Sequence, residues 1–180
     1  MNSRDLVQRF SVALNELFHR DGELFDLGTH GINEQTLTFR LGLYLASQFP
    51  GHNVDCEYNR LWDGKKHCQR FGISWMKPDV VVHIRQSDEA NLLCIEAKKS
   101  KDWKDLEALP DDVGQKLKAL THPEEAYHYA LGLAWRIAPS GDPNDHDAVW
   151  FVSGEPVLTT RLRDFEDQLH SKLEEMEVFR

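Results

Sequence analysis

The 180-residue chain contains no apolar run that approaches the roughly 20 residues needed to cross a membrane. Its first residues are polar and charged and lack the apolar core of a signal peptide. Its three cysteines are odd in number and widely spaced, which disfavours a disulfide framework and a paired zinc motif. We therefore expect a cytoplasmic protein that has no membrane partner.

Several familiar catalytic signatures are also missing. The chain has no GxSxG sequence around a nucleophilic serine. It has neither a phosphate-binding Walker loop nor a dinucleotide fingerprint, so ATP and NAD dependence have no support. The formal net charge of −9 argues against indiscriminate binding to nucleic acid, although a local basic track remains compatible with it.

Apolar periodicity and turn residues predict an alternation of helices and short strands. The predicted helices cover residues 4–19, 33–48, 103–120 with a break at Pro110, and 162–176. The predicted strands cover residues 53–60, 78–83, 92–98, 127–137 and 147–153. This order predicts the α/β class, with a mixed central β-sheet flanked by helices. The helix before 127–137 should connect two parallel strands.

We expect one domain over residues 1–180. Residues 1–30 would form an N-terminal helix and loop, 33–137 the core, and 147–180 a strand and the C-terminal helix. Within the core, residues 61–77 are polar and basic and are predicted to form a loop.

Charged residues lie on two strands that otherwise have the composition of buried strands. Asp79 begins the apolar run 78–83, and Glu96 and Lys98 end the run 92–98. A buried strand normally excludes unpaired charge, because desolvating an ion is very costly. The linker has hairpin length, so Asp79 should lie near Glu96. Glu96 and Lys98 are two residues apart and therefore share one face.

Two carboxylates beside one amine suit a divalent cation. Mg²⁺ binds one or two carboxylates and retains several waters and substrate phosphate oxygens. A buried structural ion pair, or charges that reach solvent at the strand ends, would explain the same pattern without a metal. We favour the metal site, because both halves lie on apolar strands and a further acid, Glu34, lies upstream.

Glu34 follows Asn33, a good N-cap residue, at the start of the second predicted helix. It precedes the apolar residues of that helix at helical spacing, so it should lie on their face. One explanation is an acid favoured by the helix dipole. The other, which we prefer, is a side chain directed at the metal site.

The motif Pro78-Asp79, followed by Glu96-Ala97-Lys98, resembles that of the PD-(D/E)xK nuclease superfamily. The fold of that superfamily is the fold of type II restriction endonucleases. The resemblance covers roughly residues 33–137. It implies a restriction-endonuclease-like α-β-β-β-α-β core.

The resemblance also implies roles for single residues. Asp79 and Glu96 correspond to metal ligands, the Ala97 main-chain carbonyl to a further ligand, and Lys98 to the catalytic lysine. Many relatives carry an acid on the helix before the sheet, and Glu34 is the matching position. The implied cofactor is Mg²⁺ or Mn²⁺.

Basic residues gather on both sides of the motif and are candidate contacts for the phosphate backbone of nucleic acid. They are Arg60, Lys65, Lys66, Lys77, Lys99 and Lys101. The sequence thus predicts a metal-dependent nuclease with DNA as its favoured substrate. A homodimer would supply the two active sites needed to cut both strands. The alternative is a catalytically silent nucleic-acid- or protein-binding module on the same fold.

Other polar residues are expected to face solvent. Asp55 and Glu57 lie on the polar side of the first strand, with a place near the metal as the alternative. Asp112 and Lys116 are spaced as an i, i+4 pair on the exposed side of a helix. Trp75, in the basic loop, has two interpretations: stacking on a nucleobase, or packing in the core or the loop.

Overall fold

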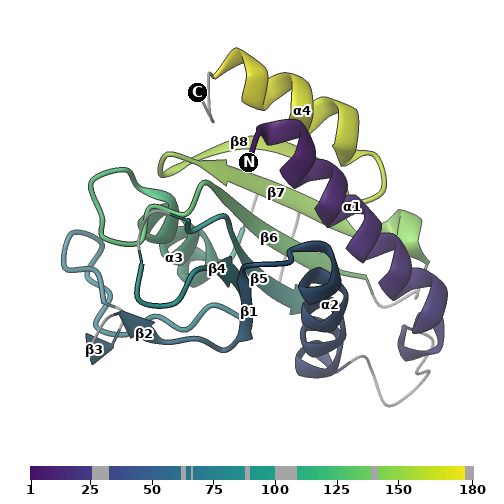
Figure 1. The fold of residues 1–180 in the computed structure, drawn as a ribbon, viewed down its shortest axis with the longest axis horizontal. Helices are drawn as coiled ribbons and strands as arrows, with labels where there is room; N and C mark the ends of the chain where they lie inside the picture. The colour runs from purple at the N-terminus through teal and green to yellow at the C-terminus, as the bar shows by residue number, and fades with distance from the viewer. Residues whose placement is uncertain are drawn as a thin grey trace.

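A computed structural model of the chain describes residues 1–25, 33–61, 64–65, 67–87, 90–99, 109–138 and 142–176. It has a mixed six-stranded sheet with helices on both faces (Figure 1), which confirms the predicted α/β class. The strands of the sheet are β1 (Asn53–Cys56), β4 (Val80–His83), β5 (Leu93–Lys99), β6 (Leu131–Ile137), β7 (Asp147–Val152) and β8 (Glu155–Arg161). The α-helices in the described ranges are α1 (Ser3–Arg20), α2 (Glu34–Gln48), α3 (Asp111–Thr121) and α4 (Phe165–Glu175).

The strands lie in the order β1-β4-β5-β6-β7-β8. β4 and β5 pair antiparallel, as the hairpin prediction required. β5 and β6 pair parallel, and α3 lies between them in the chain, so the predicted crossover is confirmed. The other neighbouring pairs of this sheet are antiparallel.

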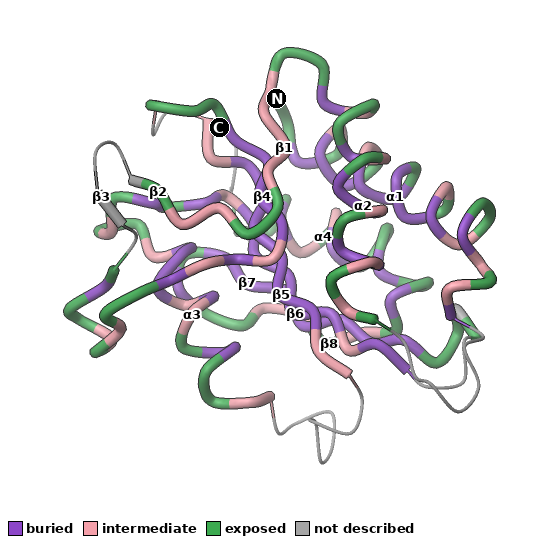
Figure 2. The backbone as a smooth tube through the Cα atoms, turned by 90° about the horizontal axis from the view of Figure 1, so that it is seen from below, coloured by how far each residue is buried: buried purple, intermediate pink, exposed green. Residues whose placement is uncertain are grey.

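The two faces of the sheet are covered unequally. α1, α2 and α4 lie over one face and α3 over the other (Figure 2). Successive side chains of β6 point to opposite faces of the sheet and therefore belong to different cores. Leu133 and Trp135 belong to the core under the three helices, whereas Ala134 packs in the cluster on the α3 side.

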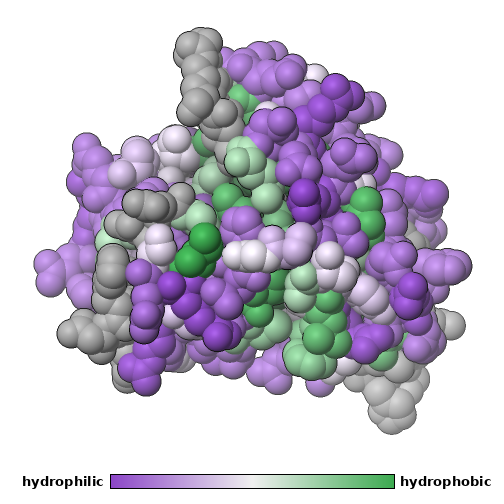
Figure 3. Space-filling view, viewed as in Figure 1, coloured by the Kyte–Doolittle hydropathy of each residue, from purple (hydrophilic) through white to green (hydrophobic). Residues whose placement is uncertain are grey.

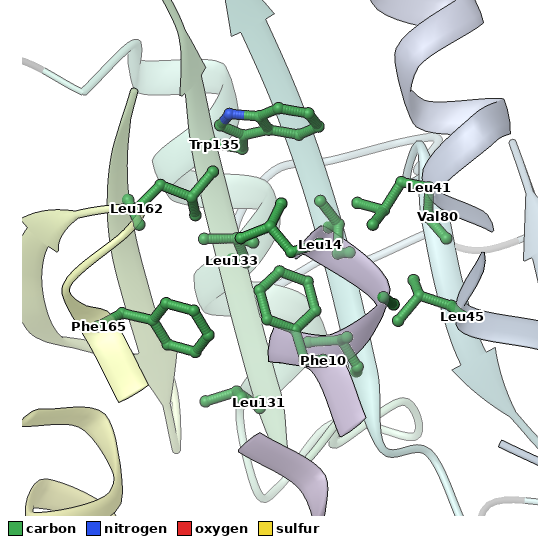
Figure 4. Close-up of a cluster of buried hydrophobic side chains, with 14 of the residues drawn as sticks. Phe10, Leu14, Leu41, Leu45, Val80, Leu131, Leu133, Trp135, Leu162 and Phe165 are labelled. Atoms are coloured by element: carbon green, nitrogen blue, oxygen red, sulfur yellow. The ribbon is translucent and has the colours of Figure 1, made fainter. Parts of the chain in front are cut away.

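The larger core lies between the sheet and its three covering helices. Figure 4 shows Phe10 of α1 and Phe165 of α4 beside the β6 side chains, with Leu41 of α2 at the β4 end. Phe10 meets Trp150 edge to face at 5.4 Å. This packing holds α1 and α2 against the sheet and so fixes the start of α2 near the end of β5.

Close approach of α3 to the sheet depends on a glycine. A Cβ atom at Gly132 would lie 2.9 Å from Thr121 Cγ2 and 3.2 Å from Phe151 Cβ. Because Gly132 has no side chain, the C-terminal end of α3 can approach β6 closely. Further toward its N-terminal end, α3 contacts β5 through Lys116, which bonds to Glu96.

Several details differ from the sequence-based expectations, among them the end of β1 at Cys56 rather than at residue 60. β8 was not predicted, because it is an edge strand with exposed residues and Pro156, a composition typical of both edge strands and loops. β6 begins at Leu131 rather than 127, since the Tyr127 hydroxyl bonds to His67 and the Tyr129 amide bonds to Leu120. The loop predicted over 61–77 includes part of a two-stranded ribbon, β2 (Arg60–Leu61) with β3 (Gly64–Lys65).

One further expectation concerns a segment that lies partly outside the described residues, and another concerns membrane-spanning helices. The predicted start of the third helix at residue 103 lies outside the described residues, and α3 begins at Asp111. No helix within the described ranges combines the length and apolar character needed to cross a bilayer.

The buried histidine of the larger core should make stability fall in acid. His146 Nδ1 accepts a hydrogen bond from Trp135 Nε1 at 2.9 Å, and the ring meets Phe18 and Phe25 edge to face. Burial lowers the pKa of His146 from 6.5 to about 4. Above pH 6.5 the ring is neutral in both the folded and the unfolded chain. Between that pH and about 4 only the unfolded chain takes up the proton, so the folded state loses on the order of 3 kcal/mol.

Urea unfolding near pH 7 and near pH 4 would measure this loss in the wild type and in His146→Gln. Glutamine does not titrate, so the variant should lose about 3 kcal/mol less than the wild type over that interval. Carboxylates titrate equally in both proteins and cancel in the comparison. An equal acid-induced loss in the two proteins would contradict the prediction.

Candidate active site

The hairpin of β4 and β5 brings two predicted acids together. Val80 pairs with Ile95 in the antiparallel register, so Asp79, immediately before β4, lies beside Glu96. The Asp79 amide donates a hydrogen bond to the Ile95 carbonyl at 3.0 Å. The Ala97 amide donates one to Asp79 Oδ2 at 2.8 Å, which holds the Asp79 carboxylate against β5.

Glu96 lies on the face of β5 that α3 covers and is only 1% exposed. Its Oε2 accepts a hydrogen bond from Lys116 Nζ of α3 at 2.7 Å. Its Oε1 is buried and has no hydrogen-bond partner within the described part of the chain. A buried carboxylate oxygen without a partner is costly, so this oxygen is a ready ligand for a cation.

Glu34 reaches the same end of β5 from the opposite side. It is the first residue of α2, and its Oε1 accepts a hydrogen bond from the Lys99 amide at 2.7 Å. Asn33 caps the helix as predicted, since its side chain accepts from the Thr36 amide at 3.2 Å. The cap fixes the first turn of α2, and with it the position of Glu34.

A pocket of about 270 Å³ joins these groups. Four residues that line it were predicted as catalytic or metal-binding residues: Glu34, Asp79, Glu96 and Lys98. The other lining residues are Gln35, Glu57, Trp75, Lys77 and Lys116. The pocket therefore combines carboxylates with ammonium groups beside one large aromatic side chain.

Burial dominates the electrostatics of the two strand acids. It raises the pKa of Glu96 to about 8; the charge of Asp79 acts in the same direction, and Lys116 and Lys98 oppose it. Burial also raises the pKa of Asp79, against the hydrogen bond from Ala97 and the charges of both lysines. A bound cation would favour ionisation of both carboxyl groups and lower both pKa values.

The donor set fits a hard cation such as Mg²⁺, which prefers carboxylate and carbonyl oxygens. Within the described ranges, no three His, Cys, Asp or Glu side chains form a ready-made metal cluster. One oxygen each of Asp79, Glu34 and Glu96 instead accepts a hydrogen bond, from Ala97, Lys99 and Lys116 respectively. Glu96 Oε1 is buried and lacks such a bond, so a cation bound there would compete with Lys116 for Glu96.

Sequence reasoning missed Lys116. It was predicted to pair with Asp112 on the exposed side of the helix, and this was wrong, because its ammonium group bonds to Glu96. Lys116 follows Val113 by three residues and precedes Leu117, both buried. That position flanks the apolar stripe of α3, which was the available signal for a half-buried lysine.

Asp55 and Glu57, the two acids expected to face solvent, have different surroundings in the structure. Asp55 bonds to His83 Nε2 at 2.9 Å and pairs with Arg85, so it belongs to an ion-pair group outside the pocket lining. Glu57 follows β1 at a positive φ of 53° and is exposed, as the preferred solvent-facing assignment expected, and it also lines the pocket. Its Oε2 accepts a hydrogen bond from Lys77 Nζ at 2.6 Å.

Only some of the basic residues that were predicted to contact phosphate lie at the pocket. Lys77 lines the pocket, and the Lys99 amide bonds to Glu34 at its edge. Arg60 is exposed and is not among the lining residues. For Lys65 the structure describes the backbone alone, and Lys66 and Lys101 lie outside the described residues.

No matching protein supplies a role for the pocket by analogy. Neither a protein-family model, nor a curated protein, nor a solved structure matches this chain. The function of the pocket must therefore be argued from its own residues.

Proposed function

We propose that the protein is a metal-dependent nuclease of the PD-(D/E)xK type, which hydrolyses phosphodiester bonds of nucleic acid, with DNA as the favoured substrate. One observation carries the proposal: Asp79, Glu96 and Lys98 line one pocket with Glu34, and Glu96 keeps a buried oxygen that has no partner among the described residues. The order α2, β1, β4, β5, α3, β6, with β5 and β6 parallel, supports a restriction-endonuclease-like core.

The acids of the pocket would hold Mg²⁺ or Mn²⁺. Asp79 and Glu96 are the proposed principal ligands, and Glu34 and the Ala97 main-chain carbonyl are further ligands. The ion would supply a water of lowered pKa and charge stabilisation at the phosphoryl group. The hydrogen bond from the Ala97 amide keeps the Asp79 carboxylate in place against β5.

Lys98 is the proposed catalytic lysine. It lies two residues after Glu96 on the same face of β5 and lines the same pocket. Its ammonium group would orient the attacking water and offset charge on the phosphate. Lys77 and Lys99 would contact neighbouring phosphates of the strand.

A cleavage assay tests the proposal directly. Plasmid, linear duplex, single-stranded DNA and RNA would each be incubated with Mg²⁺ or Mn²⁺, beside a chelator control and the Lys98→Ala variant. We expect cleavage that is lost in both controls. Cleavage that survives chelation or the lysine substitution would contradict the assigned mechanism.

The silent binding module has one observation in its favour. The Lys116 ammonium group already neutralises Glu96 at 2.7 Å, so an ion pair could satisfy the pocket without a metal. Calorimetric titration with Mn²⁺ separates the two functions. Uptake that disappears in Asp79→Asn supports the nuclease, whereas no specific uptake by the wild type supports the silent module.

Lys116 should weaken metal binding, because its ammonium group and the metal would compete for Glu96. In Lys116→Met we expect Mn²⁺ affinity to rise roughly tenfold, equivalent to about 1.4 kcal/mol. Isothermal calorimetry measures the affinity, after thermal unfolding has shown that the variant folds.

The matched control for this prediction is Lys118→Met on the same helix. Lys118 pairs with the exposed Glu155 at 3.9 Å and should leave Mn²⁺ affinity unchanged. Equal or weaker Mn²⁺ binding by Lys116→Met would show that the lysine does not compete with the ion.

A further inference from the structure

The aromatic side chain of the pocket is unusually open to solvent. Trp75 is 48% exposed and lines the pocket together with Asp79, Glu96 and Lys98. Indole rings normally bury their large apolar surface, so an exposed ring that lines a pocket is available for contact with a ligand. Such a ring offers a flat surface to a planar apolar ligand.

The segment before β4 holds this ring at the pocket. Met76 is fully buried in the cluster on the α3 side, while its neighbours Trp75 and Lys77 both line the pocket. Lys77 Nζ lies 5.6 Å from the Trp75 ring centroid and 2.6 Å from Glu57 Oε2. The buried Met76 side chain and the cation–π contact between Lys77 and Trp75 thus restrain the segment that carries the exposed ring.

We propose that Trp75 forms a stacking subsite for one unpaired nucleobase, so that the substrate is single-stranded nucleic acid. This inference rests on the proposed nuclease function and adds the form of the substrate. Every base has a π-face, so stacking on an aromatic side chain accepts any sequence. In a duplex the neighbouring base pairs cover those faces, and a base must leave the stack to meet the ring.

The size and charge of the site agree with a small footprint. A pocket of about 270 Å³ lies just below the roughly 300–1,000 Å³ of pockets for drug-sized ligands, which favours a small ligand group. The lysines among its lining residues are Lys77, Lys98 and Lys116, and two of them already pair with Glu57 and Glu96. With a net charge of −9, the protein is better suited to a few phosphates than to the roughly 6–10 of a duplex footprint.

Binding measurements in a cleavage-deficient background test the subsite. Lys98→Ala protein with Mn²⁺ would be titrated into fluorescent oligothymidylate, oligouridylate and a blunt-ended duplex, with Trp75 intact, Trp75→Ala or Trp75→Phe. We expect Trp75→Ala to weaken binding of the single strands roughly 5- to 150-fold, and Trp75→Phe to retain most of it. Binding of the duplex should change by less than about twofold. The two single strands show whether the sugar matters to the subsite.

Phe39→Ala is the matched control in the same background. Phe39 is 53% exposed on α2, where Figure 3 shows an apolar patch, and it is not a lining residue of the pocket. The control should bind every probe like the parent. Unchanged single-strand binding by Trp75→Ala, or an equal loss for the duplex, overturns the subsite. Absence of binding to all probes, with no cleavage by the wild type, overturns the nuclease proposal instead.

Discussion

Asp79→Asn should lower the kcat/KM of metal-dependent cleavage by about a thousandfold or more, equivalent to about 4 kcal/mol of transition-state stabilisation. The substitution keeps the size of the side chain and an oxygen that can accept the Ala97 amide bond. It removes the negative charge that the ion requires. The loss should therefore appear in cleavage and in Mn²⁺ uptake, with little change in thermal stability.

Asp112→Asn is the corresponding control for this carboxylate. Asp112 is exposed in the first turn of α3 and is not among the lining residues of the pocket. It should cleave and bind Mn²⁺ like the wild type. If Asp79→Asn retained wild-type cleavage and Mn²⁺ uptake, the pocket would not be a metal-dependent catalytic site.

Trp150→Ala should produce a large loss of stability. The ring is completely buried, stacks on Phe165 at 5.1 Å, and meets Phe10 edge to face. Truncation would leave a cavity between the sheet and two helices, at a cost of about 3–5 kcal/mol. Thermal unfolding should show a midpoint lower by roughly 6–20 °C.

Trp75→Ala supplies the matched tryptophan control. Its exposed ring should contribute within about 0.5 kcal/mol to folding stability, although it is proposed to matter for binding. The pair therefore separates an aromatic residue of the core from one of the site. Similar losses of stability in the two variants would mean that Trp75 is structural, which also weakens the stacking subsite.

The motif could be found in the sequence because its chemistry conflicts with its surroundings. Asp79 and Glu96 interrupt apolar runs, and burial of charge is costly enough to require a reason. The hairpin length of the linker then determined which two strand ends meet, as the β4–β5 register confirms. Glu34 could be assigned from helical spacing, and the Asn33 cap was readable from residue type alone.

Lys116, Glu57 and Trp75 could not be assigned to the pocket in the same way. Each comes from a segment whose position depends on packing with distant residues: α3 on Gly132, the end of β1 on its pairing with β4, and the Trp75 segment on the burial of Met76. Local spacing favoured a solvent-facing pair for Lys116. Tertiary contact with a buried acid overrides that preference, because an uncompensated charge costs more than a surface pair contributes.

By itself, the sequence determined the α/β class, the crossover between β5 and β6, and the meeting of Asp79 with Glu96. These follow from periodicity and short-range connection, which are local properties of the chain. The tertiary structure decided that Lys116 neutralises Glu96, that Glu57 joins the pocket, and that the exposed Trp75 ring lies beside it. These depend on how helix and sheet faces pack, and that packing is settled by contacts among residues far apart in the chain.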